Sequence, residues 1–344
     1  MDATTSSAED LVLEDPPPIA PGPNPMPLDW EDKIPRHREL WEKAEAQHYD
    51  PNTSIDWSAL SADDFTEEQR VAIAYWFATN ATFENSGVPT FGYGMVESYE
   101  QHLGDSTSRM LLTIARDEGN HDEMCRRVVE TVLPGFPYRR EPTSALERQA
   151  ANNLAWIHYT NSKYWSGYKR AYRERSLSAV MSPFIVGEAA ASLVYMATSK
   201  SGTHPVFSDI LRHIGTDEAR HFAFCNFLAD ATWGDLTDVE RRSLTKNLKA
   251  AYVYISVVFG EPRAPFWDVP DYFGPVHAQL ESIARDAGMG IISQEDRNDI
   301  WRKGMLRVKG VSDRFGIEFP AVEELGIEGT EVPLTEEDLL VVSF

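Results

Sequence analysis

Two short motifs of the form E-x-x-H constrain this 344-residue chain more than any other feature. They are Glu118-Gly-Asn-His121 and Glu218-Ala-Arg-His221, and they begin one hundred residues apart. On an α-helix, side chains three residues apart lie on the same face, so each motif can direct a carboxylate and an imidazole at one metal ion. One such motif is weak evidence, because a chain with this many Glu and His residues is expected to contain a match by chance.

A third match, Glu45-Ala-Gln-His48, illustrates that background. It lies in a charged segment and is preceded by Ala44, whereas Asp117 and Asp217 precede the other two motifs. No partner motif accompanies it. We therefore interpret Glu45 and His48 as incidental.

Two apolar segments are each associated with one glutamate. Each segment precedes one of the two paired motifs in the sequence. Glu84 follows VAIAYWFATNATF, and Glu188 lies inside VMSPFIVGEAAASLVYM. An uncompensated buried carboxylate is costly, so it is usually paired or neutralised. The segment 177–198 approaches the length of a membrane span, but a carboxylate at the centre of a bilayer is also costly. We therefore expect Glu188 on a buried helix of a soluble core.

The order along the chain is thus Glu, E-x-x-H, Glu, E-x-x-H. In four-helix bundles that bind two metal ions, two helices each supply one Glu and the other two each supply an E-x-x-H motif. No segment alternates apolar and polar residues for long enough to form a sheet, so the sequence predicts an all-α, ferritin-like bundle with additional helices. The predicted metal ligands are Glu84, Glu118, His121, Glu188, Glu218 and His221.

The rest of the chain is organised around that core. Residues 1–28 are a Pro-rich flexible arm, residues 29–316 form the helical domain with its metal-binding core at 66–232, and residues 317–344 are an acidic tail. Capping residues, prolines and apolar periodicity place the helices. We expect them near 36–48, 66–84, 105–133, 143–175, 178–199, 205–232, 237–260 and 294–314. An interruption is expected at 86–89, with a continuation of the second helix at 91–103, and a loop at 262–275.

Composition narrows the partners and the compartment. The 32 Lys and Arg residues face 54 Asp and Glu residues, a formal net charge of −22, so nucleic acid and membranes are poor partners. Two cysteines are too few for a disulfide framework or a thiolate zinc site. The acidic, Pro-rich N-terminus lacks the features of a signal peptide, so we expect a cytoplasmic protein.

The region 66–232, which contains the two lone glutamates and the two paired motifs, resembles the ferritin-like diiron-carboxylate oxygenases. RDEGNHDEM and TDEARHFAF are similar to the DExxH segments of soluble acyl-carrier-protein desaturases. The ligand intervals of 34, 70 and 30 residues and the EAAAS segment are closer to the AurF-type arylamine N-oxygenases. The resemblance implies an enzyme that uses two iron ions, O2 as co-substrate and an external electron donor, a ferredoxin or a reductase, to oxidise a small organic molecule.

Within that class, N-oxygenation of an amine is the first expectation. The alternative is hydroxylation or desaturation of a C–H bond, including that of a substrate bound to a carrier protein. The sequence also leaves open whether one of the two metal ions is manganese and whether the protein forms a homodimer. An iron-binding bundle without organic substrate is more remote, because the chain is longer than such a bundle needs. A radical-generating subunit is disfavoured by Cys125, since ribonucleotide reductases carry their radical tyrosine at that position.

The resemblance also implies roles for two aspartates that precede the ligand glutamates. Asp217 is expected to accept the N–H of His121, and Asp117 that of His221. Carboxylates in this position fix the orientation of a ligand imidazole.

Two further residues carry open alternatives. The N-oxygenases have an extra His ligand where this chain has Ile214, and His213 lies one position earlier. His213 joins the predicted ligands only if a π-type turn shifts the helix register; otherwise it lies on the helix surface. Ser192, one turn after Glu188, is the candidate catalytic hydroxyl beside the O2 site, and the alternative is a bond to its own helix.

Overall fold

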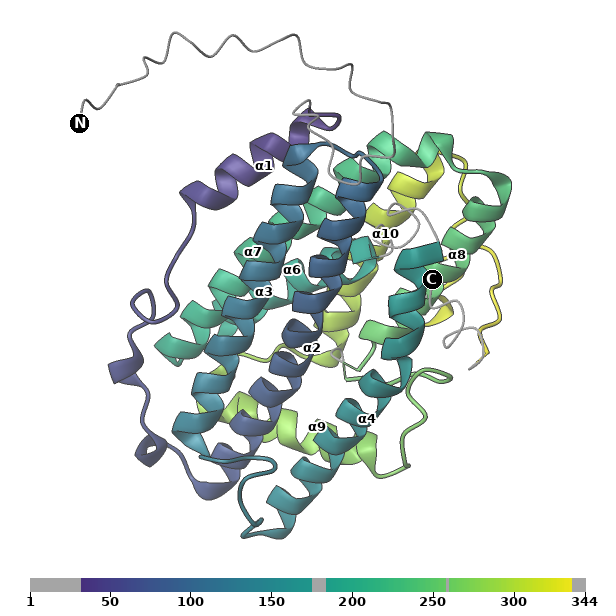
Figure 1. Cartoon of the computed structure of the whole chain (residues 1–344). Coiled ribbons are helices and arrows are strands. Elements are labelled where there is room, and N and C mark those ends of the chain that lie inside the picture. The colour runs from purple at the N-terminus through teal and green to yellow at the C-terminus, as the bar shows by residue number, and fades with distance from the viewer. Residues whose placement is uncertain (1–31, 175–183, 258–259, 336–344) are drawn as a thin grey trace, which may run out of the picture.

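The computed structural model describes residues 32–174, 184–257 and 260–335, with side chains 164–174 excepted (Figure 1). Helices make up nearly all of its regular structure, and no strand occurs in the described ranges. The predicted all-α bundle is therefore confirmed. The predicted Pro-rich arm, 1–28, lies outside the described residues.

Four long helices form the central bundle (Figure 1). They are α2 (Glu67–Glu100), α3 (Asp105–Val132), α6 (Ile185–Ser201) and α7 (Pro205–Thr232). The helix α2 packs along α3, α6 packs along α7, and the two pairs meet through α3 and α7. The connections at 101–104 and 202–204 are short, so each pair is antiparallel.

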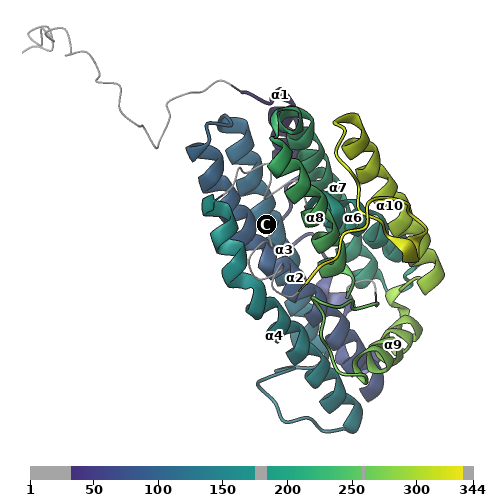
Figure 2. The same cartoon turned by 90° about the vertical axis from the view of Figure 1, so that its right-hand side faces the viewer.

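The remaining helices surround this bundle. They are α1 (Pro35–Ala46), α4 (Ala145–Glu174), α8 (Asp238–Ile255), α9 (Phe273–Ala284) and α10 (Gln294–Arg314). Short 3-10 turns lie at Trp57–Ala59, Ala62–Asp64, Trp233–Asp235 and Glu323–Leu325, and a π turn at Arg285–Met289 follows α9. The helix α1 covers α3 and α7, α4 packs on α2, and α8 and α10 flank α6 (Figure 2).

The helix α2 continues through Pro89, whereas the sequence predicted an interruption at 86–89. A proline removes the N–H that would bond to the carbonyl four residues earlier. Pro89 therefore cannot donate to the Asn85 carbonyl, yet α2 continues past it, and α3, α4 and α9 all pack on α2. Tertiary packing thus holds the helix straight enough to keep one register on both sides of the proline.

The segment 317–335 packs onto α8 rather than extending from the domain. The Tyr252 hydroxyl donates to Glu324 at 2.8 Å, and Lys249 Nζ donates to the Ala321 carbonyl at 2.7 Å. Val322, within this segment, is 0% exposed. Among the described residues, no helix is both long enough and apolar enough to cross a bilayer.

Candidate metal centre

Two overlapping groups of buried side chains converge from the four central helices. One group is Glu84, Glu118, His121 and Glu218, and the other is Glu118, Glu188, Glu218 and His221. Within each group, one potential ligand atom from every residue lies within 4.8 Å of the others. All six residues are buried. The structure therefore brings together the six residues singled out in the sequence, and their donor atoms could hold metal ions.

Glu118 and Glu218 belong to both groups. Each carboxylate has two oxygens, so one residue can bind two ions at once. Glu84 and His121 would complete the coordination of one ion, and Glu188 and His221 that of the other. Each group could thus hold a metal ion, and the two groups share the carboxylates of Glu118 and Glu218.

Glu118 fits into this cluster because α2 has no side chain at Gly87. A Cβ atom at that position would lie 2.5 Å from Glu118 Oε2, far closer than van der Waals contact allows. Gly87 is one turn after Glu84, so α2 offers a ligand and, beside it, the space for a second one.

The imidazole of His121 lies between carboxylates on both sides. Its Nδ1 is 3.0 Å from Glu84 Oε2 and 3.6 Å from Glu218 Oε1, while its Nε2 is 3.1 Å from Asp217 Oδ2. Burial alone would lower the pKa of His121, but these contacts with Asp217 and Glu84 raise it well above its usual value. The ring thus presents Nδ1 to the cluster and Nε2 to Asp217.

His221 has the same orientation but makes no hydrogen bond in the structure. Its Nδ1 lies 3.3 Å from Glu118 Oε1, 3.4 Å from Glu218 Oε2 and 3.7 Å from Glu188 Oε2. Its Nε2 lies 3.5 Å from Asp117 Oδ2. A cation among these carboxylates would satisfy the buried ring nitrogen, so the residues present fit a metal ion.

The carboxylates themselves carry more negative charge than the cluster can hold unaided. Burial and the neighbouring carboxylates raise the pKa of Glu118 and that of Glu218 to about 8. Protons or metal cations must therefore enter the cluster at neutral pH.

The two aspartates cross over between the motifs in the way the sequence analysis expected, since Asp217 lies beside His121 and Asp117 beside His221. A buried cation that the sequence analysis missed, Arg220, lies between them. Its Nη2 lies 3.3 Å from Asp117 Oδ2 and also pairs with Asp217. The sequence places Arg220 one turn from Asp217, but only the folded bundle reveals its contact with Asp117.

Two tyrosines that were also missed lie next to the cluster. The Tyr195 hydroxyl is 2.7 Å from Asn80 Oδ1 and 3.0 Å from Glu84 Oε1. The Tyr49 hydroxyl donates to Asp217 at 3.2 Å. Tyr195 lies two turns after Glu188 on α6, which is the sequence signal that would have indicated it.

His213, the extra ligand that the sequence left open, lies outside both groups in this structure. The helix α7 is α-helical from Pro205 to Thr232, without the π-type turn that ligation requires. The His213 ring instead packs on Tyr49, with centroids 4.2 Å apart, and its Nε2 is 3.4 Å from Arg212 Nη2.

Ser192 is buried on α6 but belongs to neither group. Its hydroxyl donates to the Ala189 carbonyl of its own helix at 3.5 Å, which is the alternative considered above. The third motif contributes no residue to the cluster: His48 is exposed, and Glu45 pairs with Arg116 at 2.7 Å.

Comparison of the chain with protein-family models and with curated proteins finds no match in either. The geometry of the site therefore carries the functional argument.

Proposed function

We propose that this protein is a non-haem diiron oxygenase that uses O2 to oxidise a small organic substrate. The observation that supports this best is the pair of ligand groups that share Glu118 and Glu218. Four carboxylates and two imidazoles are a donor set that suits iron or manganese, and the four negative charges match two divalent ions. When bound, the two ions would supply the electrons and open coordination positions for reducing O2.

The chain's own residues prepare the site for that chemistry. Asp217 and Asp117 hold the two imidazoles so that each Nδ1 faces the carboxylates. Arg220 balances the charge of both aspartates. Burial of all six candidate ligands excludes bulk water, which keeps the oxidant away from competing reactions.

Between the two reactions expected for this class, the position of His213 favours hydroxylation or desaturation of a C–H bond. An extra imidazole ligand would characterise an N-oxygenase-like site, and His213 packs on Tyr49 instead. N-oxygenation of an amine is the second candidate. Product analysis by mass spectrometry distinguishes them, since one adds oxygen to nitrogen and the other alters a carbon chain.

Metal content tests the assignment of the ligands. Replacing His121 or His221 by Ala removes a neutral donor and leaves excess carboxylate charge. We expect iron, measured by atomic absorption after anaerobic loading, to fall well below two ions per chain while the circular dichroism of the helices persists. His48→Ala is the matched control, because His48 is exposed and should leave iron content unchanged. Two iron ions per chain in both His121→Ala and His221→Ala would contradict the assignment of these residues as ligands.

Oxygen uptake tests the activity separately. The reduced, iron-loaded protein should consume O2 faster when an oxidisable organic substrate is added. Uptake that no amine and no C–H substrate accelerates would favour an iron-binding bundle without organic substrate.

A further inference from the structure

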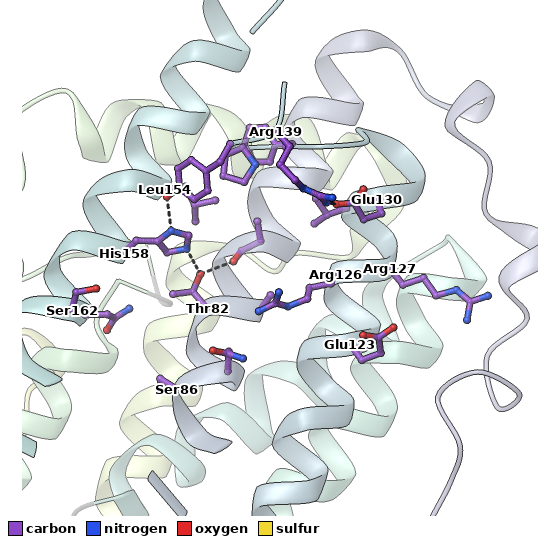
Figure 3. A pocket seen from close by; sticks show the side chains of 18 of the residues that line it. Thr82, Ser86, Glu123, Arg126, Arg127, Glu130, Arg139, Leu154, His158 and Ser162 are labelled. Atoms are coloured by element: carbon purple, nitrogen blue, oxygen red, sulfur yellow. Dashed lines mark hydrogen bonds and ion pairs between the residues drawn. The ribbon is translucent and has the colours of Figure 1, made fainter. Parts of the chain in front are cut away.

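A cavity of about 910 Å³ lies between α2, α3 and α4, outside the space enclosed by the four central helices (Figure 3). Small-molecule sites typically occupy roughly 300–1,000 Å³. None of the six candidate metal ligands lines it. Its residues on α2 recur every three or four positions from Ala78 to Pro89, so they form one helix face, and Glu84 lies on another.

The cavity wall is mostly apolar. Ala78 and Ala81 come from α2, Val129 from α3, Leu154 from α4, and Phe136 from the turn that precedes α4. A ligand with an apolar body would therefore gain free energy by leaving water for this wall.

One guanidinium in the cavity lining has a free edge, although it remains open to solvent: the Arg126 side chain is 58% exposed. Arg126 Nε donates to Asp122 at 2.6 Å, and none of the described residues accepts a hydrogen bond from its Nη1 or Nη2. Figure 3 shows the Arg126 head group directed towards Thr82 and His158, with Glu123 and Arg127 on the opposite side. The free edge of a guanidinium is a fork that matches a carboxylate.

The hydrogen bonds of His158, the histidine across the cavity, fit a neutral ring, which would not compete as a second cation. The Thr82 hydroxyl donates to the Ala78 carbonyl at 2.9 Å and therefore accepts from His158 Nε2 at 2.7 Å. Consequently His158 Nδ1 accepts from the Tyr138 hydroxyl at 2.5 Å. Burial and the charge of Arg126 lower the pKa of His158, which is consistent with the neutral ring.

A second donor in the same cavity also lacks an acceptor. Asn161 Nδ2 is buried and makes no hydrogen bond, although Asn161 lines the cavity. A buried donor without a partner is costly, and an acceptor group in the cavity would satisfy it.

We propose that this cavity binds a small organic acid with an apolar body. Its carboxylate accepts hydrogen bonds from Arg126 and Asn161, and its apolar part lies against Ala81, Phe136 and Leu154. The site is distinct from the metal cluster, and it does not depend on what the cluster binds.

Calorimetric titration of the full chain with benzoate, 2-naphthoate and octanoate tests this proposal, with 2-naphthamide as the neutral counterpart of 2-naphthoate. We expect saturable binding of at least one acid, and at least tenfold weaker binding of the amide. Arg126→Gln should weaken binding of that acid at least tenfold, because a charge-assisted hydrogen bond is lost. Asn161→Leu should weaken it severalfold.

Two control variants test whether binding is specific to this cavity. Arg127→Gln should leave binding within twofold: Arg127 also lines the cavity, but its guanidinium lies over Trp57 at 4.3 Å and donates to Asn52 at 3.2 Å, away from the bound carboxylate. His121→Ala should also leave binding within twofold, because His121 does not line the cavity. Retention of full affinity in Arg126→Gln, loss of binding in His121→Ala, or no saturable binding of any of the three acids would each overturn the proposal. Thermal unfolding confirms that each variant is folded.

Discussion

At the scale of single residues, the candidate metal centre depends on a side chain that is absent. Gly87 lies in the middle of α2, where glycine is usually unfavourable because it weakens the helix by roughly 0.5–1 kcal/mol relative to alanine. Its position is explained by the Glu118 carboxylate, which occupies the space of the missing Cβ. The glycine thus weakens the helix but leaves room for the Glu118 carboxylate, which belongs to both ligand groups.

Gly87→Ala should therefore separate metal binding from folding. The new methyl group would displace the Glu118 carboxylate, so we expect iron affinity to fall at least tenfold. Thermal unfolding of the metal-free protein should change little, because the gain in helix propensity offsets the displacement. Gly92→Ala is the matched control on the same helix, since nothing lies within 4 Å of its added Cβ. It should stabilise the fold by about 0.5–1 kcal/mol and leave iron binding unchanged. Equal iron affinity in the two variants would contradict this account of Gly87.

At the scale of helices, register decides which side chains can be ligands. The sequence placed α3, α7 and α10 to within one residue at each end. Pro134 follows α3, Pro205 begins α7, and the Ser293 side chain caps α10. It misjudged α2, where packing overrides Pro89, and it assigned no helix to 273–284, where α9 lies after a Pro-rich segment. The two paired motifs could be recognised because i and i+3 spacing is a property of the helix itself.

The register of α7 leads to a prediction about His213. A side chain five residues before Glu218 points away from the ligand face of an unbroken α-helix. His213→Ala should therefore retain two irons per chain and the absorption spectrum of the oxidised wild-type site. A shifted spectrum or a loss of iron in this variant, with Arg212→Ala unchanged as the neighbouring control, would show that α7 rearranges when metal binds.

At the scale of the whole molecule, the bundle brings together groups whose proximity the sequence could not indicate. Arg220 reaches Asp117 from another helix, Tyr195 reaches Glu84, and Arg126 faces His158 across a cavity. Each contact joins residues far apart in the chain, and helical periodicity carries no information about which helices become neighbours. The six candidate ligands were predictable because a lone glutamate followed by an E-x-x-H motif occurs twice in the sequence. The residues around them could be identified only from the packed fold.

The same assembly predicts how the metal-free protein responds to pH. Burial and neighbouring carboxylates raise the pKa of Glu118 and that of Glu218 to about 8, so the folded apoprotein retains protons that the unfolded chain releases above its ordinary pKa of 4.5. Where the folded state binds more protons, stability falls as pH rises. This contribution is fully present below pH 4.5 and is lost as pH rises to about 8. The raised pKa of His121 acts in the same direction.

We therefore expect the urea midpoint of the chelator-treated protein to fall between about pH 5 and about pH 8. The difference between iron-loaded and metal-free protein should widen over the same range, because bound metal replaces the protons that the carboxylates otherwise need. The double substitution Glu118→Gln and Glu218→Gln removes both titrating groups and should flatten the response of the metal-free protein. A midpoint that rises with pH in the metal-free wild type, or an equal slope in the double variant, would show that these two carboxylates do not control the stability of the bundle.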